Sequence, residues 1–146
     1  MFKDLKKQLE KEAQKVLLEL YPHVATIKND IKGVGYGLLL ELIPIFLSSQ
    51  NYTLKQLQSF VGLSPRVFES GTSISKRQKI SKRGSSLVRK LLYMSAMCSL
   101  RFNPIIKEKY DRMVLNGKEK MVALVACMAH IFRAVYIKFN QGFVNA

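Results

Sequence analysis

Apolar residues recur at spacings of three and four along most of this chain, and no alternating polar and apolar run of strand length occurs. A period near 3.6 places such residues on one face of a helix, whereas a half-buried strand needs a period of two. The pattern therefore predicts an all-α fold. It is clearest at the start of the chain, in Phe2, Leu5, Leu9, Ala13, Val16, Leu17 and Leu20.

Glycine, proline and capping residues divide the chain into helices. Pro22 ends the first helix, so we separate an amphipathic linking helix in residues 1–22 from a helical domain in residues 23–146. The apolar stripe of the first helix needs a partner, either this domain's own core or another helix in a coiled coil. Thr53 and Asn103 are expected helix N-caps, and Gly62 a C-terminal glycine. The later helices are predicted over residues 24–31, 36–46, 54–61, 85–102, 104–115 and 118–139.

Two of these helices have a predicted buried face. For the helix over 85–102 it comprises Leu87, Val88, Leu91, Leu92, Ser95, Cys98 and Phe102. For the helix over 118–139 it comprises Val122, Val125, Met128, Ala129, Phe132, Val135 and Tyr136.

The charge of the chain is large and uneven. Lys and Arg number 24 against 10 Asp and Glu, a net charge of +14, which is atypical of an enzyme domain and indicates a polyanionic partner such as nucleic acid. Between Arg66 and Lys90, eight basic residues face only Glu69, so this segment holds half of the net charge. A charge run is commonly just a solvated surface, but such surfaces usually mix both signs. We therefore interpret the segment as an anion-binding site.

Helical periodicity disappears over residues 64–86, where seven of the chain's 12 serines are interleaved with basic residues. This predicts a long polar loop, and loops of such length are usually functional or disordered. A hydroxyl among cations suits phosphoryl transfer through a covalent phosphoester, because cations stabilise charge on the non-bridging oxygens. The alternative is that the hydroxyls only bind phosphates and position the backbone.

A glycine-rich turn, Ile31-Lys32-Gly33-Val34-Gly35, joins two of the predicted helices. Its glycines permit positive φ, and the N–H groups at the start of the next helix would face an anion, with Lys32 adding a positive charge. This helix-hairpin-helix-like element suits binding of a phosphate backbone. The alternative is a corner between helices that needs glycine only for close packing.

Other chemistry is not indicated. Cys98 and Cys127 lack metal-ligand spacing, and His23 and His130 are expected to be surface or hydrogen-bonded core residues, so we expect no metal site in this chain. Charged residues interrupt the longest apolar runs and the N-terminus has no apolar signal region. We therefore expect a cytoplasmic protein without a membrane span.

The order of five motifs resembles a known family. IKGVG is followed by LKQLQSFVGLSPRVFESGTS, KISKRGSSLVRKLLYMSA, RFNP and a helix after NGK. Over roughly residues 27–139 this is similar to the C-terminal transposase domain of bacterial insertion-sequence transposases that carry a DEDD catalytic domain, relatives of the Piv invertases. In that family a RuvC-like domain binds magnesium through four acidic residues and a coiled coil links it to this domain. A guide-like bridge RNA helps to choose the DNA, and the C-terminal domain supplies a serine that becomes linked to DNA.

The resemblance implies a DNA-binding domain of a transposase or site-specific recombinase, with the metal-binding acidic domain missing from this chain. The ten acidic residues here are scattered and form no pair in the setting of a two-metal site, so Mg²⁺ is expected only in that missing domain. The helix over residues 2–20 would be the remnant of the linking coiled coil and a contact for homo-oligomers. DNA is the expected partner, with a structured guide-like RNA as a further candidate. The isolated domain should bind DNA without completing strand exchange; a non-catalytic helical nucleic-acid-binding module is the alternative.

Carried over by motif, the family's serine before glycine falls on Ser70, with Ser73 as the nearby alternative. Two positions depart from the pattern: Lys32 replaces the usual proline before the turn, and Glu69 places a negative charge beside Ser70. The candidate DNA-binding residues, from the charge pattern and the motifs together, are Lys32, Gly33, Gly35, Arg66, Lys76, Arg77, Lys79, Ser81, Lys82, Arg83 and Arg89.

Overall fold

The computed structural model describes residues 1–63 and 86–144, which form seven α-helices and no strand. The all-α prediction is confirmed for these residues. The predicted loop lies outside them except for Ser86. The helices are α1 (Phe2–Leu20), α2 (Val24–Asp30), α3 (Tyr36–Ser48), α4 (Leu54–Phe60), α7 (Ser86–Phe102), α8 (Pro104–Leu115) and α9 (Lys120–Val144).

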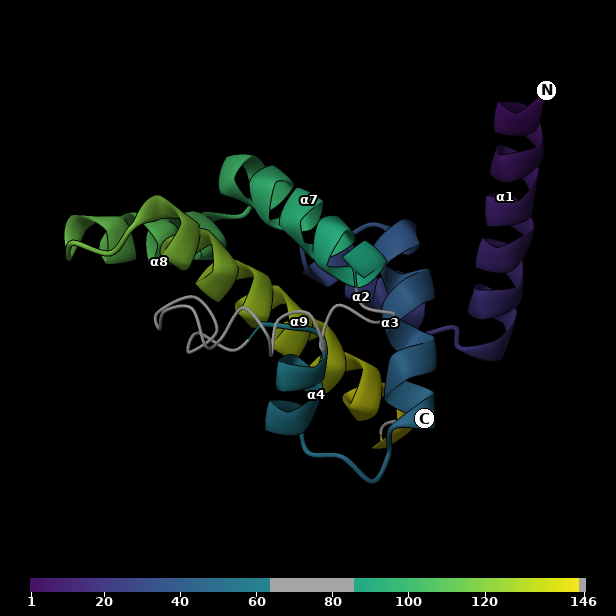
Figure 1. Cartoon of the computed structure of the whole chain (residues 1–146). Coiled ribbons are helices and arrows are strands. Elements are labelled where there is room, and N and C mark those ends of the chain that lie inside the picture. The colour runs from purple at the N-terminus through teal and green to yellow at the C-terminus, as the bar shows by residue number, and fades with distance from the viewer. Residues whose placement is uncertain (64–85, 145–146) are drawn as a thin grey trace.

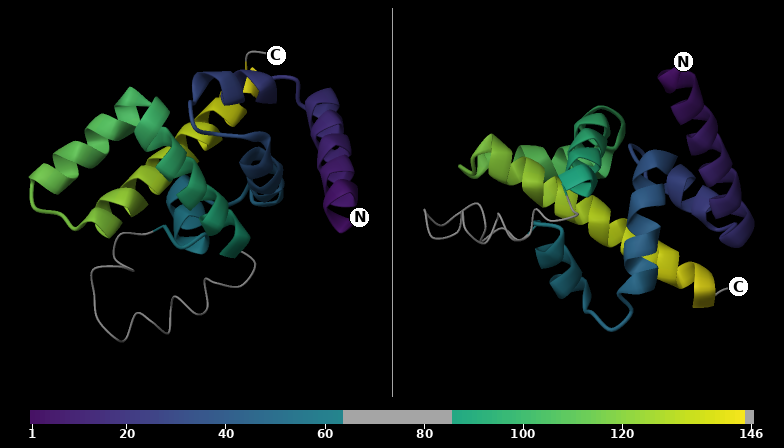
Figure 2. Two further views of the ribbon diagram at one scale, coloured as in Figure 1. Left: turned by 90° about the horizontal axis from the view of Figure 1, so that it is seen from above. Right: turned by 45° about the vertical axis from the view of Figure 1, so that its right-hand side comes forward.

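The long helix α9 forms the centre of the domain and packs against α2, α4, α7 and α8, while α3 lies against α7 (Figure 1). The two further views show α1 projecting from one end (Figure 2). By length and composition alone, Lys120–Phe143 could cross a membrane, but 56% of its apolar window is buried inside the domain. Its apolar character is accounted for by its central position in the core.

Aromatic rings hold α3 against the second half of α9. The Phe46 ring lies 5.5 Å from Phe132 and 5.3 Å from Tyr136, measured between centroids, both in edge-to-face geometry. Phe132 and Phe139 are among the largest fully buried side chains. Edge-to-face pairs add about 0.5 to 1.5 kcal/mol beyond the area they bury. The position of α3, and with it the glycine-rich turn before it, is therefore fixed by the core.

The predicted helix caps are confirmed. Thr53 caps α4 in a capping box: its Oγ1 accepts from Gln56 N at 3.2 Å, and its own N–H donates to Gln56 Oε1 at 2.9 Å. Asn103 caps α8, accepting from Ile105 N at 3.1 Å. Gly62 follows α4 with φ +79, a value that favours glycine.

The apolar stripe of α1 does not enter the core of its own domain. Phe2 is 87% exposed and Leu9 62%, and Leu17 is the one buried residue of the helix. The last turns of α1 contact α2 and α3, while its first turns project away from the other helices (Figures 1 and 2). The first half of this apolar stripe therefore does not pack on the domain's own core, which was one of its two expected partners. The other expected partner is a second helix in a coiled coil.

The predicted face of α7 was partly wrong. Val88, Leu92 and Ser95 are buried as predicted, but Leu87, Cys98 and Phe102 are exposed, and Ala96 and Ser99 are buried instead. The buried face of α7 differs from the predicted one because small residues point inward, where α9 and the turn that precedes α3 approach the helix closely. In α9 the predicted face is buried or half-buried, and the helix continues five residues past its predicted end at Phe139.

Candidate nucleic-acid interface

Four of the candidate DNA-binding residues are described by the structure: Lys32, Gly33, Gly35 and Arg89. The others, and both candidate serines, lie outside the described residues: Arg66, Ser70, Ser73, Lys76, Arg77, Lys79, Ser81, Lys82 and Arg83.

The glycine-rich turn changes the chain direction between α2 and α3. Ile31 ends α2, and the N–H of Val34 donates to the carbonyl of Ile31 at 3.2 Å. Gly33 has φ +103, in the region that residues with a Cβ avoid. Val34 is 5% exposed and anchors the turn in the core. The turn is therefore a fixed part of the fold.

The turn is held against α7 by hydrogen bonds and by a close approach of backbones. The carbonyl oxygen of Lys32 accepts from Ser99 Oγ at 3.0 Å and from Asn103 Nδ2 at 3.2 Å. A Cβ added at Gly33 would lie 2.1 Å from Ser99 Oγ and 3.1 Å from the carbonyl oxygen of Ser95. Gly33 therefore lies where the close-packing interpretation requires a residue without a side chain. Its backbone conformation and its contact with α7 both require glycine.

Gly35 is in a different setting. It is the N-cap of α3, with extended backbone, no side-chain cap and no atom within 4 Å of an added Cβ. The first turn of α3 carries no acidic residue, and the Lys32 side chain is exposed. A shallow hollow adjoins this helix start, lined by Gly33, Gly35, Gly37, Leu38, Leu91, Met94 and Ser95. An added Cβ would meet no atom at Gly35 or Gly37, whereas at Gly33 it would meet atoms of Ser95 and Ser99.

The described residues on either side of segment 64–85 lie close together in the fold. An added Cβ on Gly62, just after α4, would lie 3.1 Å from Arg89 Cδ and 3.2 Å from Arg89 Nη1. Leu63 and Val88 are both buried at this junction. The end of α4 and the start of α7, which flank residues 64–85 in the sequence, therefore lie close together.

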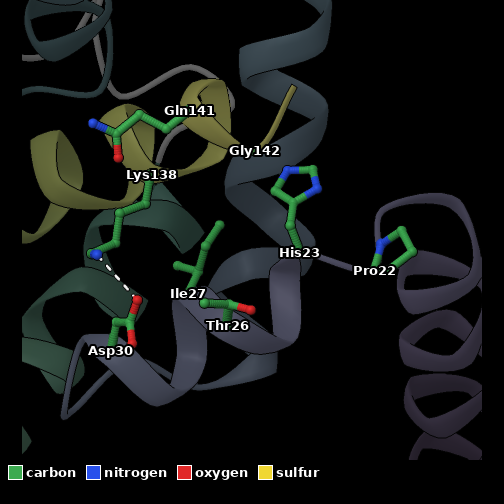
Figure 3. A pocket seen from close by; sticks show the side chains of 8 residues that line it. All are labelled: Pro22, His23, Thr26, Ile27, Asp30, Lys138, Gln141 and Gly142. Carbon is green, nitrogen blue, oxygen red and sulfur yellow. Dashed lines mark hydrogen bonds and ion pairs between the residues drawn. The ribbon is translucent and has the colours of Figure 1, made fainter. Parts of the chain in front are cut away.

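His23 has a structural role. Its Nε2 lies 3.1 Å from the carbonyl oxygen of Phe139, and its ring packs against Phe139 and Phe143. Gly142 leaves room for it, because a Cβ there would lie 2.1 Å from His23 Cδ2. The hollow beside it is spanned by an ion pair of 3.1 Å between Lys138 and Asp30 (Figure 3). The expectation of a hydrogen-bonded core histidine is confirmed.

The sequence interpretation missed Ser99 and Asn103, which hold the turn. A signal was present: Ser95, Ser99 and Asn103 are spaced by four, so small polar residues follow one face of α7.

Among residues 1–63 and 86–144, no group of three or more His, Cys, Asp or Glu could hold a metal ion. The described carboxylates Asp30 and Asp111 each pair with a lysine.

Residues 25–111, more than half of the chain, match the sequence model described as "Transposase IS116/IS110/IS902 family". Among curated proteins, the chain is 30% identical over 122 residues to the "Pilin gene-inverting protein" of Moraxella bovis, covering 82% of this chain and 38% of that protein. It is 28% identical over 133 residues to the "Insertion element IS110 uncharacterized 43.6 kDa protein" of Streptomyces coelicolor, covering 90% of this chain and 32% of that protein. The chain thus spans about a third of the length of these relatives. No solved structure matches.

Proposed function

The chain belongs to the IS116/IS110/IS902 transposase family, and from that premise we propose that it is the DNA-binding, serine-bearing domain of a transposase or site-specific recombinase. The observation that carries the proposal is the net +7 between Arg66 and Lys90, in a stretch flanked by Gly62 and Arg89, which lie close together in the fold. A cationic segment anchored at both ends can follow a phosphate backbone while the helical core stays rigid. The contacts proposed for this segment are made by Arg66, Lys76, Arg77, Lys79, Ser81, Lys82, Arg83 and Arg89.

The glycine-rich turn is the second proposed contact with the backbone. Lys32 and the open N-terminal turn of α3 after Gly35 would bind a phosphate, because exposed N–H groups and a nearby cation favour an anion. Gly33 contributes by allowing the turn to lie against α7. In this proposal, the close-packing interpretation applies at Gly33 and the anion-binding interpretation at Gly35.

Ser70 is the proposed nucleophile, with Ser73 as the alternative. Its Oγ would attack a DNA phosphorus, forming an Oγ–P bond as the bond from phosphorus to the leaving sugar oxygen breaks. The serine proton is transferred, directly or through a base, to that oxygen. Flanking cations would stabilise the charge on the non-bridging oxygens. The described carboxylates do not fit a magnesium site. Magnesium would instead be held by the acidic domain found in the family.

Four further proposals follow from the family. Residues 1–22 would be the linking helix and residues 23–146 the C-terminal helical domain. The exposed stripe of α1, including Phe2, Leu5 and Leu9, would pair with a second copy in a coiled coil. A cytoplasmic location and a guide-like RNA partner are likewise proposed by analogy with the family.

The test joins this chain to an acidic domain of the family and compares Ser70→Ala with Ser73→Ala for a covalent protein–DNA adduct. We expect Ser70→Ala to abolish the adduct and Ser73→Ala to retain it. An adduct formed by Ser70→Ala would show that the assignment is wrong. If neither serine is needed while DNA still binds, the alternative function, a non-catalytic nucleic-acid-binding module, is favoured.

A further inference from the structure

A second concentration of positive charge lies between α8 and α9. Lys109 and Arg112 are three residues apart on α8, and His130 and Arg133 are three apart on α9. Residues at this spacing share one face of a helix. We call these four residues the α8–α9 basic cluster.

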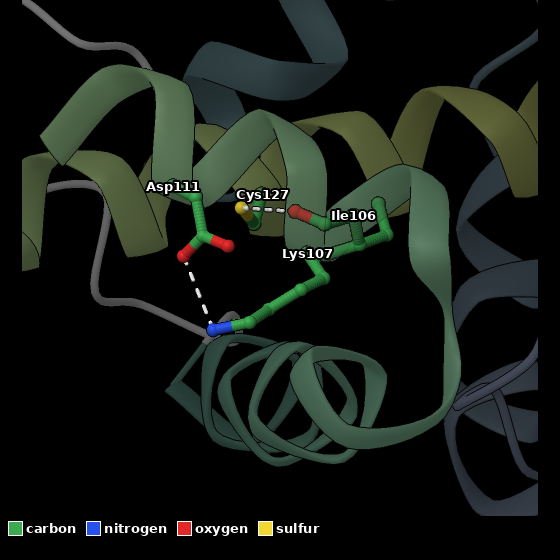
Figure 4. A network of polar contacts seen from close by, with 4 residues as sticks. All are labelled: Ile106, Lys107, Asp111 and Cys127. Atoms are coloured by element: carbon green, nitrogen blue, oxygen red, sulfur yellow. Dashed lines mark hydrogen bonds and ion pairs between the residues drawn. The ribbon is translucent and has the colours of Figure 1, made fainter. Parts of the chain in front are cut away.

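The two helices pack directly against each other, which fixes the cluster. Cys127 Sγ lies 3.9 Å from the carbonyl oxygen of Ile106, a contact across the helix pair (Figure 4). Lys109 and His130 each stand three residues from this contact and are half-buried, whereas Arg112 and Arg133 are exposed. The cluster thus combines a partly desolvated centre with two accessible guanidinium groups.

The groups in the cluster repel one another. Burial lowers the pKa of Lys109 and Arg133 lowers it further; Cys127 partly opposes these effects, and Arg112 adds the smallest lowering. Burial also lowers the pKa of His130, with Lys109 and Arg133 adding to the effect. Among the described residues, no carboxylate lies within 4.0 Å of the Lys109, Arg112 or Arg133 nitrogens. The ion pairs on α8 and α9 involve Lys107 and Lys138 instead.

We propose that the α8–α9 basic cluster binds the phosphate backbone of duplex DNA, as a contact surface additional to the Arg66–Lys90 segment. This inference rests on the proposed function, which makes DNA the polyanion available to the chain. Phosphates placed between Lys109 and the two arginines would replace repulsion by attraction, and guanidinium groups bind phosphate oxygens in bidentate geometry. The contact would be independent of base sequence, because it involves only backbone charge.

The test measures the dissociation constant of the whole chain for a labelled DNA duplex over a range of salt concentrations. The cluster variant is Lys109→Gln with Arg133→Gln. Its matched control is Lys107→Gln with Lys138→Gln, which removes the same charge from the same helices at lysines paired with Asp111 and Asp30. A second cluster variant, Arg112→Gln with Arg133→Gln, changes only exposed side chains and so avoids disturbing the core.

Each phosphate contact contributes about 0.9 to the slope of log K against log salt on duplex DNA, so two lost contacts should lower the slope by about 1.8. The affinity advantage of the unsubstituted chain over the cluster variant should then shrink about twelve-fold between 50 and 200 mM salt. The control should keep the original slope. Equal slopes for both cluster variants and the control would overturn the inference, as would a loss confined to an RNA duplex.

A variant of the 66–90 segment measured in parallel separates this inference from the proposed function. If only the segment variant lowers the slope, the cluster is not a DNA contact and the proposed function stands. If only the cluster variants lower it, the segment assignment fails and the cluster inference stands. If none of them does, both fail.

Discussion

Replacing Gly33 by alanine tests whether this glycine is required by packing against α7. The added Cβ would lie 2.1 Å from Ser99 Oγ and 3.1 Å from Ser99 Cα, at a residue with φ +103. A left-handed backbone with a Cβ costs about 1 to 2 kcal/mol, and forcing extra volume into a packed contact costs about 1 to 3 kcal/mol. We therefore expect Gly33→Ala to lower the free energy of unfolding by about 2 to 5 kcal/mol in urea titrations followed by circular dichroism.

Two comparisons sharpen this test. Gly37→Ala adds the same methyl group in α3, where nothing lies within 4 Å, and should raise stability by about 0.5 to 1 kcal/mol. In a Ser99→Ala background, where the nearest atom is gone, Gly33→Ala should cost about 1 to 2 kcal/mol less than in the unsubstituted chain. If Gly33→Ala leaves stability unchanged but weakens DNA binding, the packing explanation is refuted and this glycine acts at the ligand.

Three further predictions concern α8 and its surroundings. Asn103→Ala should lower the free energy of unfolding by about 1 to 2 kcal/mol in the same titration, because it removes the N-cap of α8. The control Asn116→Ala, at the C-terminal end of α8, should change it by less than about 0.5 kcal/mol. Folding lowers the pKa of His130, so as the pH falls the unfolded chain takes up a proton at this residue before the folded chain does. The free energy of unfolding should therefore decrease as the pH drops through about 6.5. His130→Gln should flatten this dependence in melting curves recorded over a range of pH. Added salt should raise the melting temperature by screening Lys109 from its cationic neighbours, an effect that Lys109→Gln should reduce.

The helices could be predicted from the sequence because their signals are local. Caps such as Thr53 and Asn103 act within three residues, so their positions follow from the residues beside them. The end of α9 could not be predicted in this way. It extends beyond Phe139 because the Phe143 ring packs edge-to-face on Tyr21, at 5.9 Å between centroids, more than a hundred residues earlier in the chain.

The two interpretations of the glycine-rich turn could not be separated from the sequence. The partner of Gly33 is Ser99, which is distant in sequence, and its small side chain gives no apolar signal. The same absence of signal caused the error in the α7 face, where Ser99 is buried and the more apolar Phe102 is exposed. A small polar residue is buried on a helix face where another backbone approaches closely. The periodicity of apolar residues in the sequence does not indicate where such an approach occurs.

The basic cluster was also missed, for a different reason. Lys109 and His130 come together only through the packing of α8 on α9, and neither stands in a basic run. The charge between Arg66 and Lys90, in contrast, is contiguous and could be found by counting. Sequence analysis therefore located the charge that is local and overlooked the charge that the fold assembles.

The central claim is that the basic segment binds a DNA backbone, and the salt dependence of binding tests it most directly. One variant replaces five cations of the segment by glutamine, namely Lys76, Arg77, Lys79, Lys82 and Arg83. Its control replaces five exposed lysines of α1, namely Lys3, Lys6, Lys7, Lys11 and Lys15, with the same change in charge. Relative to the unsubstituted chain, the segment variant should lose about 4 to 5 from the slope of log K against log salt, and the control almost none. Equal slopes for the two variants would contradict the claim.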